Sequence, residues 1–127
     1  MTTTTISTIK QMSPQLVVAD IDRSIEYYSK NLGFEIEFRY EDFYAGIIKD
    51  GYSIHLKSGK PSMEIRKNKI ENEHLDIVFS VNNIEPLFEE LSNKFVEINQ
   101  SLRTMPYGKE FYLTDPDGYI IAFIEQA

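Results

Sequence analysis

Few side chains of this chain are candidates for nucleophilic catalysis or metal binding, and their types exclude several classes of reaction. The chain has two histidines, His55 and His74, and no cysteine. The lack of cysteine excludes thiol catalysis, disulfides and zinc–thiolate sites. Neither histidine is accompanied by an activated serine motif, so the sequence indicates no catalytic triad. Its six glycines are scattered at turns and form no phosphate-binding loop.

Two polar residues lie inside apolar strand patterns, where each needs a partner. His55 is part of the alternating run YSIHLKS, and Asp76 is part of HLDIVFSV. Asp76 either pairs with His55 or a lysine, or presents its charge to a cationic ligand. His55 is either a half-buried histidine with an ordinary partner or a pH-sensitive contact inside a cleft. Both alternatives stay open for each residue.

The composition is typical of a single globular domain and limits its partners. The chain has 127 residues, of which 42% are hydrophobic and 13% aromatic. A net charge of −7 opposes phosphate backbones, so we expect no nucleic-acid partner. No apolar run is long enough for a membrane span and no signal peptide is visible, so we expect no membrane partner and a cytoplasmic location. The threonines at 2–5 are expected to form a frayed tail rather than an extra edge strand.

The elements that position these residues occur twice along the chain. Residues 15–20 predict a strand and residues 20–33 a helix, followed by three strands. The same order begins again at residue 74, and the apolar face of the helix recurs 63 positions later, from Ile21 to Ile84. We therefore predict an α+β fold of two βαβββ modules, at about 12–57 and 73–126, with a polar linker at 58–72. The two helix faces consist of Ile21, Ile25, Tyr28 and Leu32, and of Ile84, Phe88, Leu91 and Phe95.

Several element boundaries have clear local signals. Asp20 is a good N-cap for the first helix, and Gly33 is a good C-terminal stop. Asp50-Gly51 predicts a tight hairpin turn. The stretch from Asp115 to Gly118, Asp-Pro-Asp-Gly, predicts a type I turn between the last two strands.

Strand parity divides the strand residues between a helix-facing core and a concave cleft. Tyrosines on strands or at strand ends either reach this cleft, where their rings can stack on flat ligands, or pack across strands. These tyrosines are Tyr44, Tyr107, Tyr112 and Tyr119. The predicted core residues are Ile54, Leu56, Leu75, Ile77, Phe79, Ile121 and Phe123. The predicted cleft residues are Ser13, Gln15, Val17, His55, His74, Asp76, Val78, Ser80, Ile120, Ala122 and Ile124.

The stretches LVVADIDRSIEYYSKNLGFEI, VFSVNNIEPLFEEL and FYLTDPDGYIIAFIE together resemble the glyoxalase/bleomycin resistance/dioxygenase superfamily, also called vicinal oxygen chelate. The resemblance covers nearly everything from Ser13 to Glu125. It implies two modules that form an incurled eight-stranded sheet with helices on the convex side. Metal-holding members, such as glyoxalase I and the extradiol dioxygenases, take their ligands from the first and last strand of each module.

Carried over one residue at a time, those four ligand positions fall on Ser13, His55, Asp76 and Ala122. Ala122 has only a methyl group and Ser13 a weak hydroxyl, so we expect no cofactor. His74 lies roughly 7 Å from Asp76 on the same strand face. A rearranged site of His55, Asp76 and His74, holding Zn²⁺, Ni²⁺ or Fe²⁺, is the alternative.

The resemblance implies a small-molecule-binding protein of the bleomycin-resistance type that sequesters an aromatic or cationic compound, such as an antibiotic, without catalysis. One alternative is a metal-dependent lyase or isomerase related to glyoxalase I, and another is a non-catalytic structural or regulatory member. Two-fold pairing of modules in the family implies a homodimer, which would also cover exposed strand edges. The expected ligand-binding residues are Ser13, His55, His74, Asp76, Ala122, Tyr44, Tyr107 and Tyr112.

Overall fold

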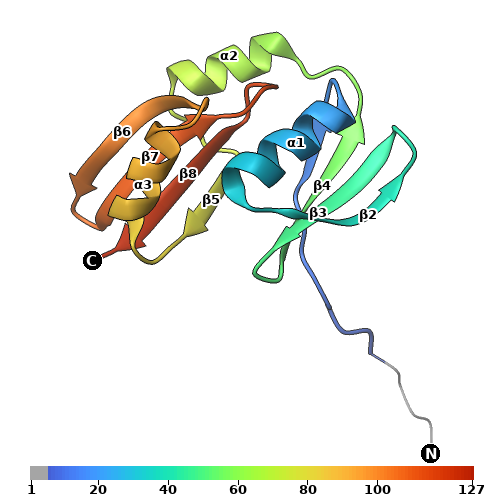
Figure 1. The fold of residues 1–127 in the computed structure, drawn as a ribbon, viewed down its shortest axis with the longest axis horizontal. Helices are drawn as coiled ribbons and strands as arrows, with labels where there is room; N and C mark the ends of the chain where they lie inside the picture. Colours follow the sequence, from blue (N-terminus) through green and yellow to red (C-terminus); the bar gives the residue numbers. More distant parts are fainter. Residues whose placement is uncertain (1–5) are drawn as a thin grey trace, which may run out of the picture.

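The computed structural model describes residues 6–127, arranged as two βαβββ modules joined by an additional helix (Figure 1). The Thr-rich residues 2–5, for which we expect a tail, lie outside the described residues. Module one contains β1 (Gln15–Val18), α1 (Ile21–Leu32), β2 (Glu35–Tyr40), β3 (Tyr44–Lys49) and β4 (Tyr52–Ser58). Module two contains β5 (Ile77–Ser80), α3 (Ile84–Ser92), β6 (Glu97–Met105), β7 (Gly108–Thr114) and β8 (Ile120–Gln126).

The eight strands form two four-stranded sheets with the same topology. Sheet A has the order β1-β4-β3-β2, and sheet B has the order β5-β8-β7-β6. In each sheet the first strand runs parallel to the last strand of its module, and the other neighbours are antiparallel. The α+β class and the two modules are therefore confirmed. Within residues 6–127 the two sheets do not close into a single eight-stranded sheet.

The first helix begins and ends where its sequence signals predict. The Asp20 carboxylate accepts a hydrogen bond from the Arg23 amide at 3.1 Å, as an N-cap does. Gly33 adopts the left-handed conformation with φ of 77°, and its amide closes the helix on the Ser29 carbonyl. None of the described helices is long and apolar enough to cross a membrane.

The second predicted helix is shorter than its apolar pattern suggests. α3 ends at Ser92, and Phe95 is completely exposed at 106% of its reference area. The prediction that Phe95 shares the buried helix face is therefore wrong, because the chain leaves the helix at Asn93 to enter β6. At the N-terminal end of α3, the Glu125 carboxylate of β8 accepts hydrogen bonds from the backbone amides of Asn83 at 3.3 Å and Ile84 at 3.0 Å.

One hydrophobic core is shared by both modules. Leu56 of sheet A and Phe111 of sheet B are both fully buried in it, together with the apolar sides of α1 and α3. The rings of Phe34, after α1, and Phe79, on β5, lie 6.1 Å apart between their centroids. Because the helix-facing sides of both sheets meet in this core, the opposite side of each sheet lies outside it. We call these sides the outer faces.

The last turn of module two joins the modules through polar contacts. The Asp117 carboxylate accepts hydrogen bonds from the Ala19 amide at 3.0 Å and from the Arg23 guanidinium at 2.8 Å. The Tyr119 hydroxyl accepts from the amide of Val17 at 3.0 Å and donates to its carbonyl at 2.7 Å. These contacts satisfy backbone groups at the free edge of β1, which would otherwise be open to pairing.

The segment expected to be a linker contains helix α2 (Met63–Glu71). Its residues are mostly polar, and its three apolar residues, Met63, Ile65 and Ile70, do not form one apolar face, so the hydrophobic pattern does not indicate a helix here. The Ser62 side chain caps it by accepting from the Ile65 amide at 3.3 Å. α2 is the uppermost helix of Figure 1, and its Ile70 packs on the outer face of sheet B. One helix therefore lies on the side where only a cleft was expected.

Candidate functional site: the outer faces of the two sheets

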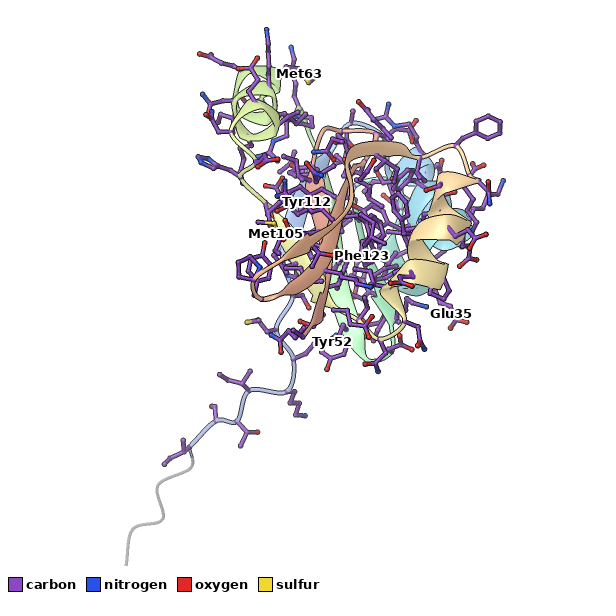
Figure 2. The ribbon with its side chains drawn as sticks, turned by 90° about the vertical axis from the view of Figure 1, so that its left-hand side faces the viewer. Glu35, Tyr52, Met63, Met105, Tyr112 and Phe123 are labelled. Carbon is purple, nitrogen blue, oxygen red and sulfur yellow. The ribbon has the colours of Figure 1, made fainter. Side chains whose placement is uncertain are left out.

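Strand parity places His55 and Ala122 on the outer faces. Ile54 and Leu56 are buried in the shared core, so His55 between them points outward. Ala122 belongs to a separate buried group outside that core, whereas Phe123 is part of the core. Figure 2 shows the same division, with Tyr112 and Phe123 on opposite sides of sheet B. Parity is therefore correct for the strand residues.

Leu75 is an exception to the predicted division. It packs against Tyr112, Ile120 and Ala122 on the outer face of sheet B instead of joining the shared core. β5 begins only at Ile77, so the alternation of a strand does not yet apply to Leu75. The prediction that Leu75 faces the helices is wrong for this reason.

The outer face of sheet A is covered by aromatic rings. We call this the aromatic face and define it by Phe38, Tyr40, Phe43, Tyr44 and His55. The rings of Phe38 and Tyr44 are nearly parallel, at 13°, with centroids 6.0 Å apart. The His55 ring meets both edge-on, at 5.2 Å from Phe38 and 5.5 Å from Tyr44. Tyr40 is 61% exposed and Phe43 is 56% exposed, so the surface is accessible to a ligand.

Hydrogen bonds fix two rings of the aromatic face. The Tyr44 hydroxyl lies 2.9 Å from His55 Nδ1 and accepts a hydrogen bond from Gln15 Nε2 at 3.1 Å. Since the hydroxyl accepts from Gln15, its own proton is available for Nδ1. In the other tautomer the hydroxyl can instead accept a hydrogen bond from Nδ1–H through its second lone pair, so this contact holds the His55 ring in either tautomer.

Gly46 provides the space in which Phe38 lies. The two residues are partners across β2 and β3, and the Phe38 ring covers the Gly46 backbone. A Cβ atom at position 46 would lie 2.2 Å from Phe38 Cε2. Only glycine allows this ring to lie flat on the sheet, which explains a glycine inside a strand.

The outer face of sheet B is apolar at its centre but is not open. Ile120 and Ala122 are fully buried, and Tyr112 is 5% exposed, because Ile70 of α2 and Leu75 pack over them. Val78, the partner of Ala122 across β5 and β8, is 50% exposed at the margin. The space beside Ala122 is therefore filled by the protein itself within this chain.

Asp76 fastens α2 to sheet B. Its carboxylate accepts hydrogen bonds from Arg66 at 2.7 Å, from Lys69 at 2.5 Å and from the Ile120 amide at 2.8 Å. Burial by itself would raise the pKa of Asp76, but these donors lower it below its ordinary value. The guanidinium of Arg66 also lies 4.3 Å from the centre of the Tyr119 ring. Of the two alternatives for Asp76, the structure shows pairing with basic side chains, and His55 is not one of them.

A second buried carboxylate lies beside Tyr112. Glu110 accepts hydrogen bonds from Arg103 Nε at 2.8 Å, from the Tyr112 hydroxyl at 2.8 Å and from the Tyr107 hydroxyl. Burial by itself would raise the pKa of Glu110, but the two tyrosines and Arg103 lower it. Tyr107 and Tyr112 thus meet at one carboxylate and hold each other in place.

The four family ligand positions do not meet within one chain. Ser13 precedes β1 and His55 lies on β4 of sheet A, whereas Asp76 and Ala122 belong to the sheet B side. His74 is exposed, and its amide donates to the Lys69 carbonyl at 2.9 Å at the end of α2. Across residues 6–127, no three His, Asp or Glu side chains are grouped as metal ligands. The residues of the alternative site, His55, Asp76 and His74, are therefore not grouped as metal ligands within the described part of one chain.

Several residues of the two faces were missed by sequence reasoning. Phe38 and Tyr40 alternate in FEIEFRYE, so parity alone could have placed them with His55. The same argument could have placed Glu110 beside Tyr112 in KEFYLTD. The position of Arg66 could not be predicted, because the sequence does not indicate the helix that carries it.

Several solved structures share this fold at low sequence identity. UcmS2 is 20% identical with a TM-score of 0.76, covering 94% of this chain and 100% of that chain. The bleomycin-binding protein from Streptomyces verticillus, solved with copper(II)-bleomycin, is 18% identical with a TM-score of 0.66, covering 96% and 100%. TnmS3, an antibiotic-binding protein from Streptomyces sp. CB03234, is 15% identical with a TM-score of 0.68, covering 98% and 100%. No curated protein matches the chain by sequence.

The family itself is shown by the sequence. The family model of the Glyoxalase/Bleomycin resistance protein/Dioxygenase superfamily matches residues 8–123, which includes every strand up to most of β8. From this match and its two βαβββ modules, the chain belongs to the Glyoxalase/Bleomycin resistance protein/Dioxygenase superfamily.

Proposed function

We propose that the protein binds and sequesters a small, flat aromatic compound on the aromatic face of sheet A, without catalysis. The observation that carries this proposal is the nearly parallel pair Phe38 and Tyr44, with His55 edge-on to both. Such a surface stacks on planar ligands, and the electron-rich faces of the rings also attract a cation. A ligand that is both aromatic and cationic suits this surface and the net charge of −7.

The structural relatives support a ligand of this kind. One is a bleomycin-binding protein solved with copper(II)-bleomycin, and another is described as an antibiotic-binding protein. Sequestration in this sense requires only that the compound is held away from its target. It needs no nucleophile or metal, which agrees with the side chains on the aromatic face.

A homodimer is part of this proposal. The aromatic face leaves large rings exposed, with Tyr40 at 61% and Phe43 at 56%. Small soluble proteins rarely leave such apolar surface uncovered. Two-fold pairing would place a second copy over sheet A of the first, and would cover the aromatic faces of both copies. Sedimentation velocity at tens of micromolar would show a dimer, and a monomer at that concentration would contradict this part.

The test of binding uses two probes, bleomycin and the planar aromatic cation thioflavin T, in calorimetric and fluorescence titrations. We expect Tyr44→Ala to weaken binding by about tenfold, because it removes one stacking ring and the hydroxyl beside His55. Tyr52→Ala is the matched control, since Tyr52 is equally a strand tyrosine and 71% exposed but lies on the other side of sheet A. Absence of binding to both probes would favour a structural or regulatory role instead.

The lyase or isomerase alternative receives no support from the described residues. A glyoxalase-type reaction needs a bound divalent metal, and the residues at the family positions do not fit one within this chain.

A further inference from the structure

A pocket of about 320 Å³ lies between the two modules, on the core side of the sheets and away from the aromatic face. We call it the inter-module pocket. Small-molecule sites in proteins begin at roughly 300 Å³, so it has room for a small ligand. Its walls come from the end of α1, the β3–β4 turn, β5, α3 and β8.

The inter-module pocket has an apolar floor. Phe34 and Phe79 lie 6.1 Å apart between ring centroids, and Phe79 and Phe123 lie 5.6 Å apart, so three rings form a continuous surface. Leu32 and Leu87 complete the apolar lining. Burying an apolar body here releases surface from water, which is the main source of affinity in such sites.

The rim of the inter-module pocket is richer in cations than in anions. Three lysines, Lys30, Lys49 and Lys94, line it, against the two carboxylates of Asp50 and Glu90. This reverses the balance of the whole chain, which has 13 basic and 20 acidic residues. A local excess of positive charge beside an apolar floor favours an anion with an apolar body over a cation.

The three lysines differ in whether their ammonium groups already have partners among residues 6–127. Lys94 donates to the α1 carbonyls of Lys30 at 3.2 Å and Asn31 at 3.3 Å, and its ammonium lies 3.6 Å from Glu90. Lys30 pairs with Glu26 at 2.7 Å. Among residues 6–127, the Lys49 ammonium makes no hydrogen bond or ion pair with a side chain or backbone group. Lys49 is therefore the cation free to meet an anionic ligand.

Gly33 keeps the space beside Lys49 open. A Cβ atom at position 33 would lie 3.1 Å from Lys49 Nζ, and the φ of 77° there disfavours any other residue. The ammonium thus lies beside the end of α1.

We propose that the inter-module pocket is a second binding site, which takes a small molecule with an aromatic body and a single carboxylate or sulfonate group. The body packs on Phe34, Phe79 and Phe123, and the anionic group pairs with Lys49. This site is separate from the aromatic face, whose ligand we propose to be a flat aromatic compound. The two sites therefore differ in the charge they select.

The experiment uses 1-anilinonaphthalene-8-sulfonate as the anionic probe and N-phenyl-1-naphthylamine as its uncharged counterpart, both titrated by fluorescence into the full chain. We expect one sulfonate probe per chain, and an affinity lower by about tenfold in Lys49→Glu. The uncharged probe should bind this variant within about twofold of the unchanged protein. Leu87→Trp, which fills the inter-module pocket, should abolish binding of both probes.

Two controls separate this site from the rest of the surface. Lys67→Glu reverses an exposed lysine on α2, outside the pocket, and should leave sulfonate binding unchanged. Tyr44→Ala should lower thioflavin T binding and leave the sulfonate probe unaffected. Equal sulfonate affinity in Lys49→Glu and Lys67→Glu would overturn the proposal. So would loss of the sulfonate probe in Tyr44→Ala with retention in Leu87→Trp, because the probe would then be on the aromatic face. Lys49 is exposed, so its variant tests the proposal even if Leu87→Trp fails to fold.

Discussion

The Tyr28 hydroxyl donates a hydrogen bond of 2.6 Å to the Asp115 carboxylate, and this contact ties α1 of module one to the last turn of module two. Both side chains are buried, Tyr28 completely. The other Asp115 oxygen accepts from the amides of Asp117 and Tyr119, each at 2.9 Å. The turn is therefore built around the Asp115 carboxylate. The protonation state of this carboxylate affects the contact between α1 and the last turn, which joins the two modules.

Stability should depend on pH through Asp115. Burial raises the pKa of Asp115 from 3.8 to about 6, despite hydrogen bonds from Tyr28 and two amides that lower it. The folded protein therefore holds this proton more tightly than the unfolded chain. The contribution of Asp115 to stability is complete below about pH 4 and is lost as the pH rises through about 6.

The comparison with Asp115→Asn isolates this contribution, since Asn can still accept from the two amides. The free energy of unfolding of the unchanged protein should fall relative to the variant by about 3 kcal/mol between about pH 4 and pH 7. Urea denaturation at several pH values measures it, with the exposed Asp42→Asn as the control. Parallel pH curves for the unchanged protein and Asp115→Asn would contradict the prediction.

Removal of one hydroxyl should loosen the free edge of β1. Tyr119→Phe keeps the ring but loses both hydrogen bonds to Val17. Leaving those backbone groups without a partner should cost about 1–3 kcal/mol in the free energy of unfolding, measured by urea denaturation. Tyr40→Phe, at an exposed tyrosine without such bonds, should change stability by less than about 0.5 kcal/mol. Equal effects of the two substitutions would show that the Tyr119 hydroxyl does not stabilise the joint.

The repeated modules were predictable because local rules and the core agree. Asp20 and Gly33 mark the ends of α1 by chemistry that requires no tertiary context, and the alternation around His55 and Ala122 follows from the geometry of any strand. Phe95 was misplaced because an apolar residue at helical spacing says nothing about where the helix stops.

The covering of sheet B was not predictable from the sequence alone. α2 is held by ion pairs of Arg66 and Lys69 with Asp76 and by one apolar contact through Ile70, not by an apolar stripe of its own. Such a helix has a polar sequence and resembles a linker. The same gap affected the candidate site. The sequence shows that Asp76 needs a partner, but it does not indicate the helix that supplies Arg66 and Lys69.

Gly46→Ala should disturb the aromatic face. The new methyl group would lie 2.2 Å from the Phe38 ring, so the ring must leave its position. We expect thioflavin T binding to weaken by about tenfold and stability to fall by about 1–3 kcal/mol. The double variant Phe38→Ala with Gly46→Ala removes the clash. Adding Gly46→Ala to the Phe38→Ala variant should therefore cost less stability than making Gly46→Ala in the unchanged protein. Additive losses would show that the two residues do not contact each other as described.

Asp76→Asn should release α2 from sheet B. The substitution keeps an oxygen for the Ile120 amide but removes the charge that holds Arg66 and Lys69. Two charge-assisted hydrogen bonds are weakened at once, and a buried guanidinium is left without its counter-ion. We expect trypsin to cleave within α2 about tenfold faster than in the unchanged protein, since cleavage follows the open population.

The control for this release is Glu71→Gln, which removes a carboxylate that belongs to α2 itself. Glu71 is exposed and lies 4.0 Å from Lys67, so its loss should leave the cleavage rate unchanged. The low pKa of Asp76 adds a second measurement, because its ion pairs persist until the pH falls below the ordinary range of a carboxyl group. In the unchanged protein, cleavage by an acid-active protease should accelerate only at that point, whereas Asp76→Asn should be cleaved quickly at every pH. If α2 is cut equally slowly in Asp76→Asn and Glu71→Gln, the apolar contact through Ile70 holds the helix without the ion pairs.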